Sequence, residues 1–289
     1  MHSSNSLYLS SISCNSYFWG MKIENGTKVL ITGGASGIGK LMGQMVLQKG
    51  AELIIWDINQ DAIDTTLSEF SKLGKVSGYR VDVSDVDQIV NAAVGVKLNQ
   101  GSIDLLINNA GIVVGKFFQD HSISEISRTM QINAIAPMYV ALQFLPDMLA
   151  RKSGHICNIA SSAGLLSNPK MSVYCASKWA VTGWSDSVRI EMQQQKTNVG
   201  ITTVMPYYIN TGMFDGVRSS VIPILNPEKA TRKIIRGIER NKIFVKMPLI
   251  VHFVRLCQGL LPIFLFDWVA GRVLGIYKTM EHFEGRKIQ

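Results

Sequence analysis

Residues 28–40 read KVLITGGASGIGK, and this stretch decides the fold of the chain. The apolar run Lys28–Thr32 is typical of a buried strand, and it stops at glycines. An apolar helical pattern follows through Leu41, Met45 and Val46. A strand, a glycine loop and a helix in this order predict a loop whose backbone approaches a pyrophosphate at the start of a helix.

Strand-like and helix-like segments alternate along the rest of the chain. Further strands are expected at residues 52–56, 76–81, 103–107, 155–160, 199–205 and 242–246. Helices are expected at residues 59–73, 85–98, 124–149, 172–195 and 227–240, with a kink at Pro137. The alternation predicts an α/β fold with a Rossmann-type, doubly wound parallel sheet of about seven strands and ligands at its carboxyl edge.

Length and composition suit a single α/β domain. The chain has 289 residues, of which 47% are hydrophobic and 17% charged. We expect a flexible extension over residues 1–24, a catalytic nucleotide-binding domain over 25–246 and an apolar, basic helical extension over 247–289. The first twenty residues lack the basic and apolar regions of a signal peptide. No metal or redox spacing relates the four cysteines, so we expect a cytoplasmic protein with reduced thiols at Cys14, Cys157, Cys175 and Cys257, and no metal site.

A second stretch, SSAGLLSNPKMSVYCASK at residues 161–178, carries candidates for chemistry. Tyr174 and Lys178 are four residues apart and therefore lie on one face of a helix. One ammonium about 4 Å from a phenol supplies roughly the 4 kcal/mol needed to bring a tyrosine pKa of about 10 to neutrality. We therefore expect Lys178 to lower the pKa of Tyr174, and Ser161 to hold a substrate oxygen. The alternative is a buried tyrosine beside a solvated lysine.

Polar residues at other positions suggest contacts with a nucleotide. Asp57 follows the second strand, about twenty residues beyond the loop, where it can accept hydrogen bonds from adenosine ribose hydroxyls. The same charge would repel a 2′-phosphate, which favours NAD over NADP; the alternative role is a helix cap. Asp82 closes the third strand and can bind the adenine amino group. Asn133 lies in an apolar helical stretch and needs polar partners, such as a bound water.

With these residues in place, the chain resembles the one-domain short-chain dehydrogenase/reductase family from about Lys28 to Lys246. TGGASGIG matches the family's TGxxxGxG, and residues 108–111 match its NNAG. The stretches LINNAGIVVGK, GHICNIASSAG, YCASKWA and INTGMF are similar to the branch that contains retinol and 17β-hydroxysteroid dehydrogenases. The family's catalytic tetrad is matched by Asn133, Ser161, Tyr174 and Lys178.

The resemblance implies an oxidoreductase that transfers a hydride between NAD and a lipophilic alcohol or ketone, such as a retinoid, steroid or long-chain lipid. It implies that Tyr174 transfers the proton, Lys178 holds the nicotinamide ribose and Ser161 holds the substrate oxygen. Asn133 would order a water in the proton relay. The implied cofactor contacts are Gly33, Ser36, Gly37, Ile38, Gly39, Asp57, Asp82, Val83, Asn109, Ala110, Gly111, Tyr174, Lys178, Pro206, Ile209 and Thr211.

The substrate side departs from the family pattern at one position. Tyr207 stands where the family has a glycine after the proline of the sixth strand. A mobile flap is expected over residues 210–225, which hold glycine, proline and apolar residues. The implied substrate contacts are Ser161, Tyr174, Tyr207, Met213 and Phe214.

Two other functions stay open. A 3-ketoacyl-type reductase of fatty acid or polyketide metabolism normally prefers NADPH, so Asp57 disfavours it. A non-catalytic nucleotide-binding scaffold need not keep all four tetrad residues. The family resemblance also implies a homodimer or homotetramer, formed by the helices that bear Asn133 and Tyr174 through outer apolar positions such as Trp184.

The net charge of +8 is concentrated near the end of the chain. From Asn226 onward there are twelve Lys and Arg against five Asp and Glu, without a nucleic-acid recognition motif, so no nucleic-acid partner is expected. Residues 247–270 are strongly apolar but are interrupted by Pro248, Gly259 and Pro262, which disfavours a transmembrane helix. Two alternatives stay open for this segment. In one alternative it packs over the substrate site, as a lid, or against a partner subunit. In the other it lies peripherally on an anionic membrane.

Overall fold

The computed structural model describes residues 20–285, and its centre is a parallel sheet. The strands follow the order β3-β2-β1-β4-β5-β6-β7. Strand order reverses between β1 and β4, so the loops after these two strands diverge and leave a crevice at the carboxyl edge. The predicted doubly wound parallel sheet of about seven strands is confirmed. The strands are β1 (Lys28–Thr32), β2 (Glu52–Asp57), β3 (Val76–Arg80), β4 (Leu105–Asn108), β5 (Gly154–Ile159), β6 (Val199–Pro206) and β7 (Phe244–Met247).

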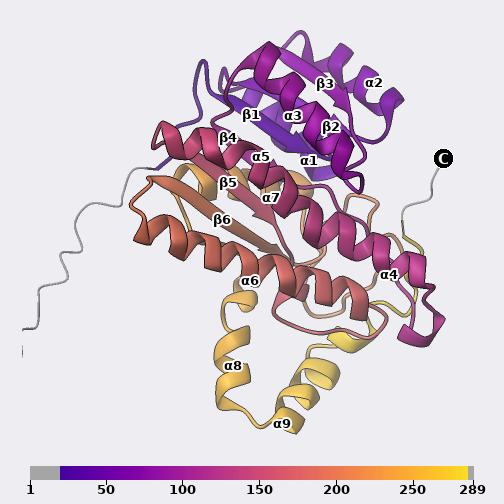
Figure 1. Cartoon of the computed structure of the whole chain (residues 1–289). Coiled ribbons are helices and arrows are strands. Elements are labelled where there is room, and N and C mark those ends of the chain that lie inside the picture. Colours follow the sequence, from indigo (N-terminus) through magenta and orange to yellow (C-terminus); the bar gives the residue numbers. More distant parts are fainter. Residues whose placement is uncertain (1–19, 286–289) are drawn as a thin grey trace, which may run out of the picture.

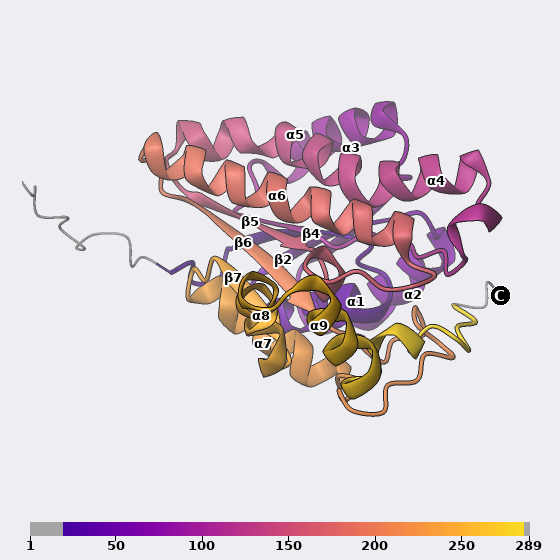
Figure 2. The same ribbon diagram turned by 90° about the horizontal axis from the view of Figure 1, so that it is seen from below.

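Helices cover both faces of the sheet (Figures 1 and 2). One face carries α1 (Gly37–Leu47), α2 (Gln60–Phe70) and α7 (Pro227–Glu239). The other carries α3 (Val86–Gln100), α5 (Ala136–Ala150) and α6 (Ser172–Gln194). Each face has its own apolar core, because the strands are buried on both sides and alternate side chains point to opposite faces. Short 3₁₀ turns lie at Phe118–Asp120 and Ser162–Gly164.

The long helix expected over residues 124–149 contains a wide turn. Helix α4 (Ile123–Met130) continues through a π-helical turn, Gln131–Ile135, into α5. The amide of Ala136 donates to the carbonyl of Gln131, and Pro137, which has no N–H to donate, follows directly. Within the described chain, Ile123–Ala150 is the stretch whose length and composition would allow it to cross a membrane; 50% of its most apolar part is buried. Its packing over the sheet accounts for that composition.

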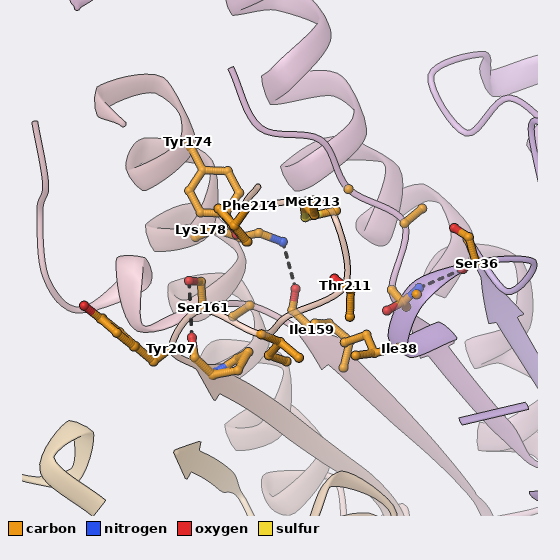
Figure 3. Close-up of a pocket in the computed structure, with 18 residues that line it drawn as sticks. Ser36, Ile38, Ile159, Ser161, Tyr174, Lys178, Tyr207, Thr211, Met213 and Phe214 are labelled. Atoms are coloured by element: carbon orange, nitrogen blue, oxygen red, sulfur yellow. Dashed lines mark hydrogen bonds between the residues drawn. The ribbon is translucent and has the colours of Figure 1, made fainter. Parts of the chain in front are cut away.

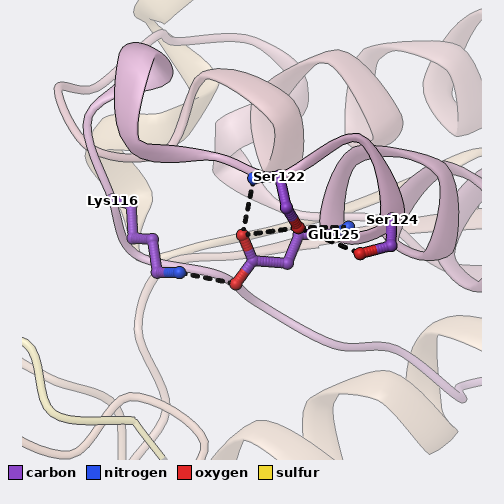
Figure 4. Close-up of polar contacts among 4 residues, drawn as sticks. All are labelled: Lys116, Ser122, Ser124 and Glu125. Carbon is purple, nitrogen blue, oxygen red and sulfur yellow. Dashed lines mark hydrogen bonds and ion pairs between the residues drawn. The ribbon is translucent and has the colours of Figure 1, made fainter.

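Helix α4 begins with a reciprocal cap (Figure 4). The amide of Glu125 donates to the Ser122 hydroxyl at 3.2 Å, and the Glu125 carboxylate accepts from the Ser122 amide at 2.9 Å. Lys116 donates to the same carboxylate at 2.6 Å. The hydrogen bond from Lys116 has the largest effect on the Glu125 carboxylate, and together with those from Ser122 it lowers the pKa of Glu125 to about 2. The cap fixes where the loop after β4 ends and α4 begins.

The structure corrects two details at the ends of predicted segments. Ile23 is buried in the core, so the folded domain begins a few residues before position 25; residues 1–19, and Cys14 with them, lie outside the described residues. Trp184, expected on an outer helix face, is half-buried and packs against the α5 side of the core. Trp179, one turn earlier, is exposed instead. The other three cysteines are free thiols, and two of them are buried.

The C-terminal extension divides into two parts. Residues 249–268, here called the C-terminal hairpin, comprise a 3₁₀ turn (Leu249–His252), α8 (Val254–Leu260) and α9 (Ile263–Trp268). The hairpin projects away from the sheet (Figures 1 and 2). Residues 270–285, here called the C-terminal tail, include the end of a π turn (Val269–Val273) and a 3₁₀ turn (Ile276–Lys278), and they pack back onto the domain. The helical extension expected over residues 247–289 is therefore made of several short helical turns.

Candidate active site

The glycine loop between β1 and α1 is built for close backbone approach. Gly33 and Gly37 have φ of 62° and 54°, a conformation that favours glycine. A Cβ on Gly39 would lie 2.1 Å from the carbonyl oxygen of Gly33, so a side chain there does not fit. The start of α1 then directs free backbone N–H groups toward the crevice, an arrangement that suits a phosphate.

The loop is fastened to β4. The hydroxyl of Thr32 accepts hydrogen bonds from the amides of Asn109 and Ala110 at 3.0 and 3.1 Å. The side-chain amide of Asn109 donates to the carbonyls of Thr32 and Gly33, both at 3.0 Å. Asn109 is thus a structural fastener of the glycine loop as well as a wall of the crevice.

A pocket with eighteen lining residues lies at the carboxyl edge of β1, β4, β5 and β6 (Figure 3). Twelve predicted cofactor residues line it: Gly33, Ser36, Gly37, Ile38, Asn109, Ala110, Gly111, Tyr174, Lys178, Pro206, Ile209 and Thr211. All five predicted substrate residues line it as well: Ser161, Tyr174, Tyr207, Met213 and Phe214. The predicted residues outside its lining are Gly39, Asp57, Asp82, Val83 and Asn133. Sequence reasoning missed Ile159 and Ala160, whose position between β5 and Ser161 was the available signal.

Lys178 is buried and holds a strand end. Its ammonium donates to the carbonyl of Ile159 at 2.8 Å and lies 5.7 Å from the centre of the Tyr174 ring. Burial lowers the pKa of Lys178 to about 8, because the charged form loses its hydration. Lys178 is only 5% exposed, which excludes the alternative of a solvated lysine beside a buried tyrosine.

The expected depression of the Tyr174 pKa by Lys178 is not what the structure shows. Burial raises the pKa of Tyr174 well above its usual value, and only the hydrogen bond with Ser161 opposes that effect. The Lys178 ammonium donates to the carbonyl of Ile159 and lies 5.7 Å from the centre of the Tyr174 ring. Burial therefore favours the neutral phenol at this place.

Asn133 has protein partners for its side chain. Its amide nitrogen donates to the carbonyl of Ile112 at 2.9 Å and to the hydroxyl of Ser177 at 3.1 Å. Its oxygen accepts from the amide of Ile112 at 2.8 Å. A Cβ on Gly111 would lie 3.3 Å from this oxygen and 3.7 Å from the Lys178 ammonium. Asn133 thus braces the loop after β4, close to the lysine.

The two predicted nucleotide carboxylates support loops. Asp57 accepts from the amide of Ala35 in the glycine loop at 3.1 Å and from the amide of Asn59 at 3.2 Å. Asp82 accepts from the amide and the hydroxyl of Ser84 at 2.9 and 2.6 Å. Asp57 is the last residue of β2, and Asp82 lies two residues beyond the end of β3. The helix-cap alternative for Asp57 is not seen, because the cap of α2 is Asn59.

Aromatic rings form the wall of the pocket opposite the glycine loop. The Phe214 ring meets Tyr174 edge-on at 6.0 Å between ring centres and Tyr208 at 5.0 Å. Tyr207 packs against Tyr208 at 4.6 Å, and its hydroxyl lies 3.1 Å from that of Ser219. The tyrosine that replaces the family's glycine therefore belongs to an apolar wall. This wall and the polar pair of Ser161 and Tyr174 suit a molecule with one oxygen and a large apolar body.

The C-terminal tail closes the same side. Thr279 is buried, and its hydroxyl lies 3.0 Å from that of Tyr208 and accepts from the side-chain amide of Asn168 at 2.9 Å. The tail also binds the predicted flap, because the amide of Glu284 donates to the carbonyl of Asp215 at 2.9 Å. The lid expected over residues 247–270 stays a prediction: Phe266 and Ala270 pack in the apolar cluster that contains Tyr174, but no residue of this segment lines the pocket.

Known proteins are similar to most of this chain. The model of the family "short chain dehydrogenase" matches residues 27–221. Epidermal retinol dehydrogenase 2 of Mus musculus is 37% identical over 268 residues, covering 91% of this chain and 86% of that protein. Estradiol 17-beta-dehydrogenase 11 of Homo sapiens is 32% identical over 243 residues, covering 83% and 81%.

Solved structures share the fold. A short chain dehydrogenase/reductase from Burkholderia phymatum, in complex with NAD, has a TM-score of 0.75 and 25% identity, covering 83% of this chain and 95% of that one. A metagenomic short-chain oxidoreductase in complex with NADP has a TM-score of 0.68 and 24% identity, covering 79% and 98%. Structural neighbours of this chain therefore include proteins with either nicotinamide dinucleotide.

The buried Lys178 predicts a pH dependence of stability in protein without nucleotide. Its pKa of about 8 in the folded protein lies below the usual lysine value of 10.5, so between these pH values the unfolded chain binds more protons. The free energy of unfolding of the unmodified protein, relative to that of Lys178→Met, should therefore rise from pH 8 toward pH 10.5 by up to about 3 kcal/mol. Urea unfolding of both proteins across this range tests the prediction; parallel curves of free energy against pH contradict it.

Proposed function

Because the chain belongs to the short-chain dehydrogenase family and is an oxidoreductase acting on CH–OH groups, we propose that it transfers a hydride between NAD and a lipophilic alcohol or ketone. The observation that carries the proposal is the pocket wall. Phe214 and Met213 line a space whose polar end is Ser161 and Tyr174, and Tyr207 lines its edge (Figure 3). A retinoid, a steroid or a long-chain lipid has the matching chemistry, one reacting oxygen on an apolar body.

Proton transfer is assigned to Tyr174. The Ser161 hydroxyl, which hydrogen-bonds Tyr174, positions the substrate oxygen beside the phenol. In reduction, the protonated phenol donates its proton to the oxygen as negative charge develops there; in oxidation, it receives the proton of the alcohol. The nicotinamide, when bound, supplies or accepts the hydride. Because burial favours the neutral phenol, oxidation needs an added stabilisation of the phenolate.

Lys178 is the cation available for that stabilisation. Its ammonium lies 5.7 Å from the Tyr174 ring centre and is excluded from water, so its field on the phenolate is weakly screened. The same ammonium lines the pocket and is placed to donate to the nicotinamide ribose. Asn133, which braces the loop beside Lys178, is proposed to order a water that connects to this lysine.

NAD is the proposed cofactor because of Asp57. Its carboxylate lies at the end of β2 and fastens the glycine loop through Ala35, so it lies where an adenosine ribose follows a bound diphosphate. A carboxylate there accepts from ribose hydroxyls and repels a 2′-phosphate. Gly39 gives α1 its close approach to the loop, and Asp82 and Val83 are proposed to border the adenine.

We also propose two contacts outside the pocket. The first is assembly into at least a homodimer through the outer faces of α5 and α6, where Tyr139, Leu142, Trp179 and Ile190 are exposed. The second is peripheral contact with a membrane through the C-terminal hairpin, whose apolar side chains face outward. Both proposals rest on exposed apolar surface, which single soluble domains keep small.

Removing the Tyr174 hydroxyl tests the proton-transfer role. Tyr174→Phe should lower turnover of a lipophilic alcohol with NAD at least about a hundredfold, the scale of general acid–base catalysis, and should still bind NAD. The control is Tyr79→Phe on β3, away from the pocket. It removes a hydroxyl that donates to Gln100 at the end of α3, and it should keep normal turnover. Near-normal turnover of Tyr174→Phe would refute the role.

Changing Asp57 tests the choice of cofactor. Asp57→Ala should weaken NAD about 10- to 100-fold, since a hydrogen bond to a charged group contributes about 1.5–3 kcal/mol. Asp57→Asn keeps the acceptor for the amide of Ala35 and removes the charge, so it should mainly raise kcat/KM with NADP. The assignment fails if the unmodified protein uses NADP as well as or better than NAD.

Light scattering at micromolar concentration tests the assembly. The unmodified chain should have at least twice the mass of one chain, and Leu142→Glu on α5 should reduce it to the monomer by burying a charge in the interface. Leu98→Glu on α3 is the matched control, because Leu98 is also exposed and lies off the proposed interface. A monomeric mass for the unmodified chain contradicts the proposal.

A further inference from the structure

Basic residues gather in a groove between α7 and β7. Helix α7 buries one apolar face, with Ala230, Ile234 and Ile238 against the core. Positions three, four and seven residues apart on its other face are basic, so they share one side of the helix. The residues that line the groove, here called the cationic groove, include Lys229, Arg232, Lys233, Arg236, Arg240, Lys242, Lys246 and His252.

The positive charge of the groove is largely uncompensated. Within residues 20–285, Arg232 is the one groove cation paired with a carboxylate, that of Glu228 at 3.8 Å. Lys233 donates instead to the carbonyl of Lys246 at 2.9 Å. Burial and the nearby charge of Lys242 lower the pKa of Lys233, which shows that these cations act on one another. The groove therefore attracts anions.

The C-terminal hairpin presents an apolar surface next to this groove. Leu260, Ile263 and Phe264 are 73%, 80% and 76% exposed, and Trp268 and Phe253 are also exposed. Such side chains have no partner in the described chain and favour the boundary between lipid headgroups and acyl chains. Exposed apolar surface beside uncompensated cations is the pattern of a surface helix on an anionic membrane.

Groove and hairpin lie at the same edge of the sheet. β7 is the last strand in the sheet order, and His252 of the groove lies two residues before α8. Arg255 of α8 stacks over Phe244 of β7 at 5.8 Å, and Lys246 lies 5.5 Å from the same ring. Figures 1 and 2 show α8 and α9 projecting away from the sheet. The base of the hairpin and the groove are therefore neighbours through His252 and Arg255.

We propose that the cationic groove and the C-terminal hairpin together form a docking face for an anionic phospholipid bilayer, with lipid phosphates bound in the groove. The hairpin lies in the interface, and the groove selects membranes by their charge. The proposal deepens the membrane contact proposed above. An acidic protein would match the groove alone, whereas a bilayer offers phosphates and an apolar layer at neighbouring depths.

Docking by this face brings the substrate pocket to the lipid. Gln258 of α8 donates to the carbonyl of Leu165 at 2.9 Å, in the segment that follows Ser161. Phe266 of α9 and Ala270 pack in the same apolar cluster as Tyr174 and Tyr207. The base of the hairpin thus forms part of the wall between the bilayer and the pocket, the side from which a lipophilic substrate would arrive.

Vesicle flotation of the full chain tests the proposal with two pairs of variants. Vesicles of phosphatidylcholine alone are compared with vesicles that also contain phosphatidylserine, at low salt. Lys229→Gln/Lys242→Gln should bind anionic vesicles about thirtyfold more weakly, since each lysine near an anionic surface contributes about 1 kcal/mol. Its control, Lys72→Gln/Lys196→Gln, removes two exposed lysines away from the groove and should bind normally.

The second pair tests the hairpin. Ile263→Ser/Phe264→Ser should reduce binding to anionic vesicles at least tenfold, while Phe118→Ser/Ile123→Ser, which alters similarly exposed residues near α4, should leave it unchanged. The proposal is overturned if the groove variant and the hairpin variant each bind anionic vesicles as strongly as their control variants. It is also overturned by binding that is equal on neutral and anionic vesicles, or by release by millimolar inorganic phosphate, which would indicate a site for free phosphate.

Activity toward a water-soluble alcohol separates this test from that of the proposed function. All four variants should keep their turnover with NAD in the absence of vesicles, because none alters the pocket lining. Lost flotation with normal turnover supports the docking face. Normal flotation of the groove and hairpin variants overturns it whether or not the enzyme is active.

Discussion

The fold depends on the hydrogen bonds between the end of β1 and the end of β4. The Thr32 hydroxyl accepts from two successive backbone amides, and the Asn109 side chain returns two bonds to the glycine loop. These bonds join the halves of the sheet where strand order reverses, and they leave the first turn of α1 free toward the crevice. A glycine loop is flexible by composition, so this fastening gives it one shape before a nucleotide arrives.

The second constraint is a cation enclosed by protein. Lys178 exchanges water for the carbonyl of Ile159, which costs stability and places a weakly screened charge near Tyr174. Burial acts on both groups in the same sense, since it disfavours the charged form of each. The site therefore favours a neutral phenol, and it lowers the pKa of Lys178 to about 8.

The C-terminal extension serves the site in two ways. The C-terminal tail packs behind the aromatic wall of the pocket through Thr279 and Tyr208, and it holds the predicted flap at Asp215. The C-terminal hairpin exposes its apolar side chains beside the cationic groove. Exposed apolar side chains lower the solubility of a domain, and contact with a bilayer would cover them. The proposed docking face rests on this difference: the tail packs against the domain, whereas the hairpin is exposed to solvent.

The sequence by itself determined the alternation of strands and helices, the glycine loop and the chemistry-bearing set of Ser161, Tyr174 and Lys178. These are local properties, because periodicity, the glycine requirement and motif spacing are read within a few tens of residues. Only the tertiary structure decided that burial outweighs Lys178 in setting the Tyr174 pKa, that Trp184 is half-buried, and that residues 247–285 divide into a hairpin and a tail. Burial and hydration depend on which distant segments cover a residue, and no local pattern records that coverage.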